Sequence, residues 1–514
     1  MNFFTKNIKR IYNNLRLAPK VYKFIKDNGR TQIKAAAPSR FYNGWSSSRQ
    51  EIDATIRGGL VSVRSHARDL ELNNGNVNKI IQDFIKYVIG SEAPKFQCLI
   101  RQNNGDLDDE LNEAVEEKFR EWCKADFCTL SKDLSFVRVC WGIIRQLVIA
   151  GEFIIRQEMK NPNKFGFTFE LLEPDYIDET YNDVLPSGNV VRMGIEFNPL
   201  KQKVRYHLKK NLNHITSIPA YDLTPVEAFQ IIHDFDRLRF TQSRALSSLT
   251  PIMVDVHKFD KMEDASLDKA IINSRTSGFI SSTPEGFSQY SGGDLAKANK
   301  NLSDEEDNVD TVEEEEDEVF ELESGVYVDL KDKRFIGFDP KFPFEMFNDF
   351  IKSVARRISS GVGLWYNILF NDLENVNFSS LRHGRTDSIE TYKHFQTLMR
   401  EGFLNVFTPN WFKQAVLSGE INFPFSKIET HFRYSWQFRG YEYIQPVDDI
   451  NASVTAIENN LSTKTAEAAK VGKDFDAIIR ERKRELKKEK ELAVIESEIQ
   501  KLKNPVVAKT GEAA

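Results

Sequence analysis

The sequence predicts a mixed α+β protein in which long helices follow a part built from short helices and strands. Two observations support this fold class. Residues 51 to 240 alternate between stretches of helical periodicity and short strand-like runs closed by polar turns. After residue 250, apolar residues recur at helical spacing over long stretches. With 514 residues, 40% of them hydrophobic, the chain can bury a sizeable core and form roughly two to four domains.

Charge and cysteine content narrow the class of protein. The net charge is only −6, so any contact with nucleic acid must be local. The cysteines at positions 98, 123, 128 and 140 lack the spacing of a zinc site and are expected to be reduced, buried thiols. No apolar run approaches the roughly 20 residues that span a membrane, and no signal peptide is recognised. Synthesis in a reducing, intracellular setting is therefore expected.

The first segment, residues 1–35, is a basic arm. It is rich in Lys and Arg and contains a single acid, Asp27, and its apolar residues recur at helical spacing. Two interpretations remain open. The arm could contact DNA, scaffold or another subunit, or it could be a solvated helical tail.

In the next part, each element is predicted from its periodicity. Helices are expected near Val77–Tyr87 and at Asp109–Cys123. Strands are expected at Glu152–Gln157, Phe165–Leu172, Val204–Leu208 and Phe229–His233. Together these elements predict a mixed α+β domain.

A long helix is then predicted from about Pro251 to Ser274, with proline in the first turn, where its missing N–H costs nothing. A strand at Gly278–Ser281 follows it. Residues 304–323 form an acidic run that cannot pack upon itself. The run lacks the glycine and the ligand spacing of a calcium loop, so a solvated loop is the favoured interpretation.

Beyond the acidic run, strands are predicted at Val326–Leu330 and Arg334–Gly337, before a helix from about Pro343 to Ser360 that Gly361 and Gly363 end. The irregular segment Leu364–Phe378 leads to a second long helix, Ser379–Phe407. Residues 451–503 are almost wholly helix-forming and could pack with copies of themselves.

Motifs for catalysis are scarce. The sequence has no G-x-x-x-x-G-K-[ST] phosphate loop, no H-E-x-x-H and no G-x-S-x-G, and its histidines lack ligand spacing. No cofactor and no metal are predicted. One enzyme hypothesis remains, a metal-dependent nucleic-acid-processing enzyme that uses Glu173, Asp175 and Asp178. Their segment, L-E-P-D-Y-I-D, also makes an ordinary turn, which is the favoured interpretation.

Two segments resemble the lambda-type portal proteins of tailed bacteriophages. Residues 372–382, D-L-E-N-V-N-F-S-S-L-R, are similar to the family's D-x-x-x-V-N-[YF]-S-S-x-R and follow a helix-plus-glycine segment, Arg356–Gly363, as in the family. Residues 460–485 carry N-L-S-T, G-K-D and E where the family has G-L-x-T, G-x-D and E, with Asn460 in place of glycine.

Weaker likenesses fall in family order between these segments and the N-terminus. They are R-S-H-A-R-D-L-E-L-N-N at 64–74, G-E at 151–152, L-E-P-D-Y-I-D at 172–178, G-I-E-F at 194–197 and I-H-D-F at 232–235. The family's R-x-G-Q-x-R-G appears as R-F-T-Q-S-R-A at 239–245, without either glycine, and its W-V-D-P-x-K is replaced by I-Q-P-V-D at 444–448. The resemblance covers about residues 36–490.

The resemblance implies a portal fold assembled as a ring, with a mixed wing domain, a helical stem, a small α/β clip and a helical C-terminal crown. On this chain it implies a basic arm at 1–35, the wing at 36–250, stem helices at 251–277 and 343–362, the clip at 278–342 with an acidic insertion at 303–323, a tunnel loop at 363–378, a long helix and wing return at 379–445, the crown at 446–503 and a disordered tail at 504–514.

The function implied is a dodecameric channel at one capsid vertex, through which double-stranded DNA is packaged and ejected, without enzyme activity. Expected partners are copies of the same chain, DNA without sequence specificity, the terminase large subunit, the head–tail connector or adaptor, the major capsid protein and scaffold, with no membrane. The expected location is the portal vertex of the virion, with the host cytoplasm during assembly.

In the tunnel loop, Asp372, Asn375 and Asn377 are candidates for groups near DNA. A capping role for the two asparagines before the long helix, with Ser379 or Ser380 as N-cap, is favoured over direct contact, and the two roles are compatible.

The stem and the clip supply the remaining candidates. Lys352, Arg356 and Arg357 on the second stem helix could form basic rings that hold phosphates without reading sequence. Pairing with acids of the neighbouring stem helix, such as Glu263, Asp264 or Asp268, is an equal alternative. In the clip, the candidates for docking terminase or the connector are Asp329, Lys331 and Arg334.

Overall fold

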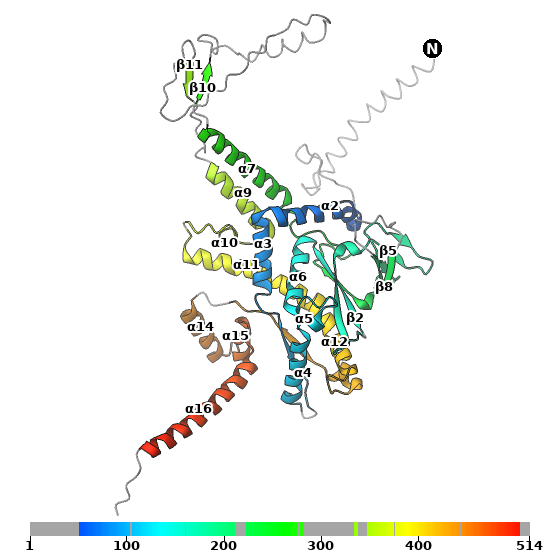
Figure 1. The fold of residues 1–514 in the computed structure, drawn as a ribbon, viewed down its shortest axis with the longest axis vertical. Coiled ribbons are helices and arrows are strands. Elements are labelled where there is room, and N and C mark those ends of the chain that lie inside the picture. The colour runs from blue at the N-terminus through cyan, green and yellow to red at the C-terminus, as the bar shows by residue number, and fades with distance from the viewer. Residues whose placement is uncertain are drawn as a thin grey trace, which may run out of the picture.

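A computed structural model shows a mixed α+β body from which helices project at both ends (Figure 1). The structure describes residues 51–102, 105–159, 161–210, 223–275, 278–281, 334–337, 347–374, 376–441 and 445–503. The predictions for the basic arm, the acidic insertion, the strand Val326–Leu330 and the tail at 504–514 lie outside these residues. The predicted α+β class is confirmed by the elements that follow.

Helices form much of the N-terminal part of the body: α2 (Ile52–Asn73), α3 (Gly75–Val88), α4 (Asp109–Trp122), α5 (Ala125–Cys128) and α6 (Phe136–Ile149). The predictions for α3 and α4 are confirmed, and each begins at a side-chain cap, Asn74 and Asp108 respectively. Sequence reasoning missed α2, which contains the pair Gly58-Gly59, and α6, whose run of valine and isoleucine is typical of a strand.

Two antiparallel sheets follow. In the first, β2 (Glu152–Met159) lies between β3 (Phe167–Leu172) and β9 (Ile231–Phe235), with Ile154 opposite both Leu172 and His233. The second has the order β4 (Asp183–Val184), β5 (Val190–Arg192), β6 (Ile195–Phe197), β7 (Lys203–Lys209) and β8 (Leu223–Glu227).

All four strands predicted in this region are confirmed. The last begins two residues later than predicted, because Ala228–Gln230 forms a 3-10 turn before β9. A similar turn, Pro174–Tyr176, follows β3.

An aromatic core joins the two halves of the chain. Trp122 of α4 is fully buried and donates its indole N–H to the carbonyl of Phe167 (3.0 Å). The ring of Phe119 meets that of Trp411, far along the chain, edge to face at 4.9 Å. Nearby, β1 (Lys95–Cys98) pairs antiparallel with β12 (Tyr434–Gln437). Residues before 130 and after 400 thus share one core.

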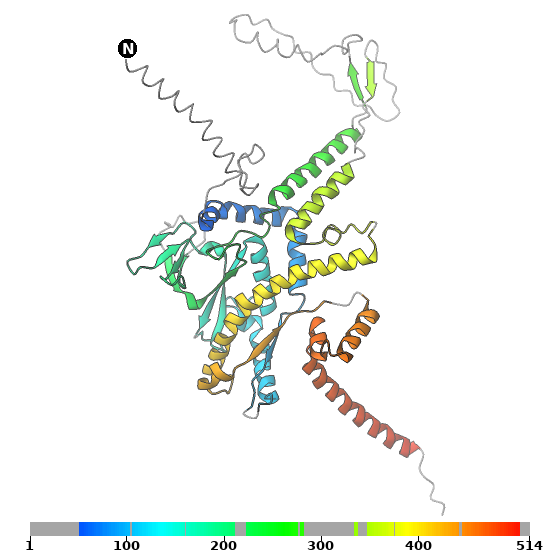
Figure 2. The same cartoon turned by 180° about the vertical axis from the view of Figure 1, so that it is seen from behind.

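The helices α7 (Met253–Arg275) and α9 (Phe347–Val362) lie side by side and project from the body (Figures 1 and 2). At their far end β10 (Gly278–Ser281) pairs with β11 (Arg334–Gly337). All four predicted elements are confirmed, the two strands with the predicted bounds and the two helices with different ends. Pro251 lies in the turn before α7 rather than in its first turn, and α9 continues through Gly361.

The chain then forms α10 (Tyr366–Leu369), α11 (Phe378–Met399), a π-helical turn (Arg400–Leu404) and α12 (Asn405–Leu417). The prediction of one helix ending at Phe407 was too short. The helix continues through Pro409, which has no N–H to donate to the carbonyl of Asn405. That carbonyl accepts the Tyr434 hydroxyl instead (3.3 Å). The turn Phe425–Lys427 and α13 (Ile428–His431) precede β12.

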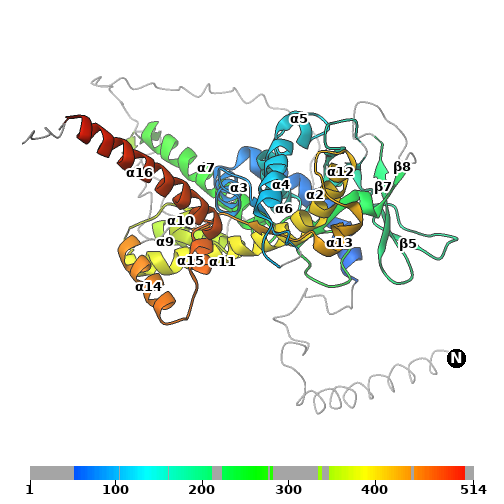
Figure 3. The same ribbon diagram turned by 90° about the horizontal axis from the view of Figure 1, so that it is seen from below.

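The C-terminal part is helical, as predicted: α14 (Pro446–Glu458), α15 (Lys464–Lys470) and α16 (Phe475–Lys503). Figure 3 shows α16 extending away from the body. The N-cap of α15 is Thr463, and the Asp474 carboxylate accepts the backbone N–H of Asp476 (2.9 Å) at the start of α16. These caps explain the T and the D of the C-terminal signature.

The glycine of that signature lies where two backbones touch. Gly472 has a φ of +73°, and a Cβ on it or on Gly440 would overlap the backbone of the other. The backbone N–H of Tyr441 donates to the carbonyl of Lys470 (3.3 Å) beside this contact. The C-terminal helices are therefore joined to the end of β12 by a contact that leaves no room for a side chain.

The cysteines are free thiols, as expected. Cys98, Cys128 and Cys140 are buried, whereas Cys123 is partly exposed. Burial raises the pKa of Cys98 to about 12. Among the described residues, no helix has the length and apolar character required to cross a bilayer.

Candidate nucleic-acid interface

The irregular segment after α9 is fastened to α11. The Thr391 hydroxyl donates a hydrogen bond to the carbonyl of Gly363 (2.7 Å), and the Ser388 hydroxyl accepts the backbone N–H of Trp365 (3.0 Å). Gly363 itself ends α9 with a φ of +74°. These bonds fix where the segment leaves α9 and how it crosses α11.

Asp372 organises the turn after α10. Its carboxylate accepts the Tyr366 hydroxyl (2.7 Å) and the backbone N–H of Glu374 (3.2 Å), and its carbonyl accepts the Asn367 amide (2.6 Å). Lys352 of α9 lies 3.4 Å from the Asp372 carboxylate and 3.3 Å from that of Glu374. The structure therefore brings together a tunnel-loop candidate and a stem candidate.

Two carboxylates balance the positive charge of Lys352. The hydrogen bond from Tyr366 holds the pKa of Asp372 below its usual value, and the charge of Lys352 adds to that effect. The hydrogen bond to Glu374 and the charge of Asp372 raise the pKa of Lys352. Burial, followed by the bond to Asp372, raises the pKa of Tyr366 to about 12. A lysine that faces two carboxylates offers little surplus charge to a phosphate.

Arg356 and Arg357 lie in different surroundings. The guanidinium of Arg356 lies over the Tyr366 ring, 5.4 Å from its centre, and the described residues give it no acidic partner. Arg357 pairs with Asp255 of α7 (2.8 Å). Pairing with the neighbouring helix α7 thus occurs for Arg357, through Asp255 rather than through Glu263, Asp264 or Asp268, the acids given as examples. We call Lys352, Arg356, Tyr366, Asp372 and Glu374 the loop–helix cluster.

Sequence reasoning missed Tyr366 and Glu374, which complete this cluster. Each lies within the predicted tunnel loop, but nothing in the sequence motif around them indicates a contact with α9.

The asparagine candidates divide. Asn377 is the N-cap of α11, where its side-chain oxygen accepts the backbone N–H of Ser380 (2.7 Å). This supports the capping interpretation, with Asn377 rather than Ser379 or Ser380 as the cap. Asn375 lies outside the described residues.

The clip candidates are only partly placed. Arg334 begins β11, in register with Ser281 of β10. Asp329 and Lys331 lie outside the described residues.

Glu173, Asp175 and Asp178, the acids of the enzyme hypothesis, pair with arginines or form part of a turn. Arg68 bonds both Glu173 (2.9 Å) and Asp175, and Arg64 bonds Asp175 (2.9 Å). Asp178 accepts the backbone N–H of Thr180 (3.0 Å), as in an ordinary turn. Two guanidinium groups therefore occupy the space in front of Glu173 and Asp175, which supports the turn interpretation.

Arg64 leads to a cluster that sequence reasoning did not recognise as one site. The fully buried Glu152 accepts hydrogen bonds from Arg64 (2.9 Å), from two nitrogens of Arg244 (2.6 and 2.8 Å to Oε1) and from the backbone N–H of Ala245 (3.1 Å). His233 Nε2 lies 3.1 Å from its other oxygen. We call Glu152, Arg64, Arg244, His233 and Asp175 the buried ion cluster.

Each member of the buried ion cluster comes from a different segment of the portal-like pattern. The sequence therefore contains each of these residues within a weak family motif, and the motifs are spread between residues 64 and 245. Gly151 belongs to it as well, because its φ is +80° and a Cβ there would overlap the carbonyl of Leu246. A glycine before Glu152 thus lets the segment that carries Arg244 approach.

Protonation in the buried ion cluster is fixed by its partners. Burial alone would raise the pKa of Glu152, but the charge of Arg244 and the bond with His233 hold it well below its usual value. Burial and the charge of Lys203 lower the pKa of His233 to about 3. At neutral pH the cluster contains an ionised glutamate and a neutral histidine.

Comparison with curated proteins gives relatives that span most of this chain. It is 27% identical over 467 residues to a probable portal protein of Halomonas phage phiHAP-1, covering 90% of this chain and 87% of the relative. It is 21% identical over 486 residues to portal protein B of Escherichia phage lambda, covering 86% of each.

Comparison with solved structures gives likenesses to chains of gene transfer agent (GTA) particles. One is from the neck of an empty GTA particle, with a TM-score of 0.45 and 10% identity, covering 81% of this chain and 94% of that one. Another is from the neck of a native GTA particle, with a TM-score of 0.39, 10% identity and coverage of 81% and 93%.

The sequence model of one protein family, described as phage portal protein, lambda family, matches residues 39–396. Because this match spans more than half of the sequence, the chain belongs to the lambda family of phage portal proteins.

Proposed function

We propose that the chain assembles into a dodecameric ring at one capsid vertex and that double-stranded DNA passes through it during packaging and ejection. Family membership over residues 39–396 is the observation that carries this proposal. Assembly takes place in the host cytoplasm, with the major capsid protein and scaffold, and the finished ring belongs to the virion.

Exposed apolar side chains on the projecting helices support self-association. A single chain leaves Leu267 of α7 62% exposed and Phe350 of α9 55% exposed, and Val254 and Ile271 of α7 are also exposed. Leu267 and Ile271 lie one helical turn apart on α7, and exposed apolar side chains grouped in this way are typical of protein interfaces. In a ring, neighbouring copies would cover it.

The described contacts favour Arg356 over Lys352 as the stem residue that meets DNA. Lys352 is held by Asp372 and Glu374, whereas Arg356 is exposed, lies over an aromatic ring and has no acidic partner among the residues that the structure describes. Ring symmetry would repeat Arg356 around the channel and form a belt that binds phosphates without reading sequence. Asp372 and Asn377 then act by shaping the loop. Asn375 stays a candidate for direct contact.

We assign docking of the terminase large subunit, and later of the head–tail connector, to the β10–β11 end. This assignment rests on its position at the far end of α7 and α9 (Figures 1 and 2). Asp329, Lys331 and Arg334 are the proposed docking residues.

Negative-stain microscopy of the purified full chain tests the ring. We expect particles with a central hole and twelve-fold symmetry. A chain that stays monomeric at every concentration, or that forms particles without a hole, would contradict the proposal.

Anisotropy of a labelled DNA duplex at fixed salt tests the belt. Arg356→Gln in assembled rings should weaken binding about threefold and reduce its salt dependence, because phosphate contacts release counterions. Lys352→Gln removes the same charge and is the matched control, for which we expect a smaller change. Equal effects of the two substitutions would show that Lys352 also meets DNA, and loss of rings would show a structural role.

A further inference from the structure

The C-terminal helix α16 projects from the body at the end opposite to β10 and β11 (Figures 1 and 2). In Figures 1, 2 and 3 it extends on the same side of the body as α10 and the start of α11, where the proposed tunnel loop lies. Every residue from 481 to 496 whose burial the structure describes is exposed. A helix placed in this way offers its faces to a partner outside the chain.

The charges of α16 are sorted by sign. From residue 480 to 490 the sequence reads R-E-R-K-R-E-L-K-K-E-K, and no two residues four positions apart carry opposite charges. Residues four apart are neighbours on a helix surface, where like charges weaken the helix and opposite charges stabilise it. A helix whose charges serve only to keep it in solution typically places opposite charges at this spacing. The sorting therefore indicates that a charged face of α16 has a partner.

Three lysines lie on one face of the helix. Lys483, Lys487 and Lys490 follow each other at spacings of four and three residues, which places them on the same side. All three are exposed, and the part of the chain that the structure describes gives none of them an ion-pair partner. We call these three lysines the lysine face.

Elsewhere on α16 the charges are balanced. Arg482 pairs with Glu485 (3.1 Å) and Glu489 (3.2 Å), so two acids are balanced within the helix. Near the start of α16, Lys483 lines a hollow that acids also line, namely Asp106, Asp109, Glu116, Asp474 and Asp476. Lys487 and Lys490 lie about one and two turns farther out than Lys483. The outer part of the lysine face thus carries the positive charge that has no balance.

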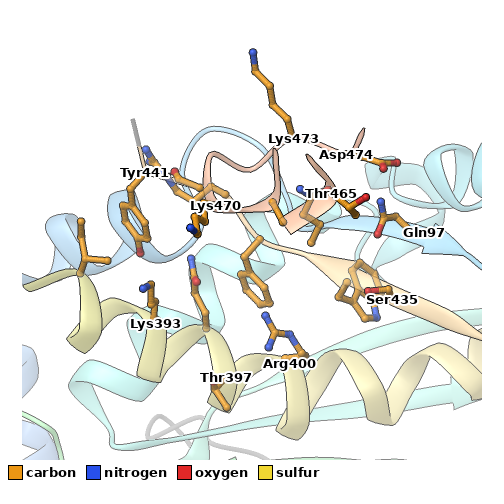
Figure 4. A pocket seen from close by; sticks show the side chains of 18 of the residues that line it. Gln97, Lys393, Thr397, Arg400, Ser435, Tyr441, Thr465, Lys470, Lys473 and Asp474 are labelled. Atoms are coloured by element: carbon orange, nitrogen blue, oxygen red, sulfur yellow. Dashed lines mark hydrogen bonds between the residues drawn. The ribbon is translucent and has the colours of Figure 1, made fainter. Parts of the chain in front are cut away.

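The turn before α16 also directs a cation outwards. This turn lies over a cavity of about 690 Å³ that α11 borders on the other side. Figure 4 shows the Lys473 side chain pointing away from the cavity, whereas Lys470 pairs with Glu467 (2.6 Å). Lys473 is exposed and therefore adds its charge to the solvent side of this region rather than to the cavity.

The composition of the lysine face favours a nucleic acid over a protein as the partner. From residue 480 to 490 the only apolar residue is Leu486, whereas the centre of a protein interface is apolar and poor in lysine. Lysine is a hydrated point charge, which suits phosphates that are contacted without reading the bases. At ~1.5 Å per residue the face is about 10 Å long, and one strand of B-DNA carries about three phosphates over that length.

We propose that the lysine face binds the phosphate backbone of double-stranded DNA without reading its sequence. The inference rests on the proposed passage of DNA through the ring and adds a second contact, at the end remote from β10 and β11. Each copy in a ring would carry the same face, so the modest charge of one chain would become a basic belt. Such a belt would hold DNA at the opposite end of the assembly from the docking residues.

Anisotropy of a short labelled duplex, titrated with the purified full chain at several salt concentrations, tests the proposal. Lys487→Gln combined with Lys490→Gln removes two cations and keeps helix-forming side chains. We expect binding to weaken about tenfold at low salt. The slope of log Kd against log salt should fall by about two, because each phosphate contact contributes about 0.9.

The matched control removes the same charge from the body. Lys132 and Lys201 lie in exposed turns, so Lys132→Gln combined with Lys201→Gln should leave the affinity and the slope unchanged. Lys487→Arg combined with Lys490→Arg keeps the charge and should bind like the unsubstituted chain, which separates a lost contact from a damaged helix. Duplexes of unrelated sequence should bind alike. The proposal is overturned if the two glutamine variants bind DNA equally well.

Two other partners would give different results. If the Lys487→Gln and Lys490→Gln chain fails to self-associate but binds DNA normally, the lysine face contacts a second copy, and the DNA assignment is wrong. If a glutamate-rich peptide binds the unsubstituted chain through these lysines and the duplex does not, the partner is an acidic protein, which also contradicts it.

The result does not depend on ring formation, because one chain carries the whole lysine face. DNA binding that falls on substitution in a chain that forms no rings would support the lysine face and contradict the proposed ring. Rings with a central hole whose DNA binding is unchanged by the substitutions would support the ring and overturn the lysine face.

Discussion

The buried ion cluster and the loop–helix cluster contain the same kinds of group in opposite environments. Glu152 and Arg244 have no exposed side-chain surface, whereas Lys352 is 33% and Glu374 is 76% exposed. A charge taken out of water is costly unless opposite charges and hydrogen bonds compensate it, so the loss of one member of the first cluster leaves another uncompensated. Exposed pairs contribute little to stability and can exchange partners. The buried ion cluster therefore holds together segments between residues 64 and 245, and the exposed pairs of the loop–helix cluster are more readily exchanged.

Breaking the buried ion cluster should have the largest effect. Glu152→Ala leaves Arg64 and Arg244 buried without their shared partner, so we expect the free energy of unfolding to fall by about 3–5 kcal/mol. Chemical denaturation followed by tryptophan fluorescence measures this change. Glu374→Ala in the loop–helix cluster is the control and should change stability by less than about 1 kcal/mol. Similar losses in the two variants would remove the distinction between the clusters.

Acid should weaken the buried ion cluster through His233. Its pKa is about 3 in the folded chain and about 6.5 when the chain is unfolded, so the unfolded chain binds more protons between these values. Stability should therefore fall as pH drops from about 6.5 towards 3, by up to about 1.4 kcal/mol per pH unit from this group. The low pKa of Glu152 adds a loss of the same sign at the acidic end.

Denaturation curves between pH 7.5 and about 4.5 check this sign. His233→Gln should flatten the dependence, whereas His394→Gln on the exposed face of α11 should keep it. An unchanged slope in His233→Gln would show that another group governs the acid response.

Removing a cap next to the loop–helix cluster should have the smallest effect. Asn377→Ala should cost about 1 kcal/mol of stability, the usual loss for an N-cap. Ser379→Ala and Ser380→Ala are matched controls that remove a hydroxyl without removing the cap, and the same unfolding measurement should show little change. A greater loss for either serine would place the cap there.

The two clusters also differ in how far the sequence could predict them. Periodicity identified α3, α4, α7 and α9, because apolar residues recur along each at helical spacing. It failed for α6, whose Val and Ile residues are typical of a strand, although its buried residues recur every three or four positions as in a helix. The members of the buried ion cluster were recognised as family letters, but no spacing along the chain indicates that residues 64, 152, 175, 233 and 244 converge on one carboxylate.

The loop–helix cluster was half predicted. Lys352, Arg356 and Asp372 were named as candidates, but as two separate sites. Their meeting depends on how the turn after α10 folds back to α9, which the Tyr366 hydroxyl and the Asn367 amide decide. The partner of Arg357 was missed for a related reason. The alignment of α7 against α9 places Asp255, near the start of α7, opposite Arg357, and helical periodicity does not reveal that alignment.

The contact between Gly440 and Gly472 gives the C-terminal helices the mechanics of a lever. Its fulcrum is the close contact of two backbones, and its arm is α16, with 29 residues. At ~1.5 Å per residue the arm is about 43 Å long, so a tilt of about 5° at the fulcrum moves its tip by about 4 Å. A displacement too small to disturb the core of the body is thus enlarged to about the diameter of a side chain at the far end of the helix.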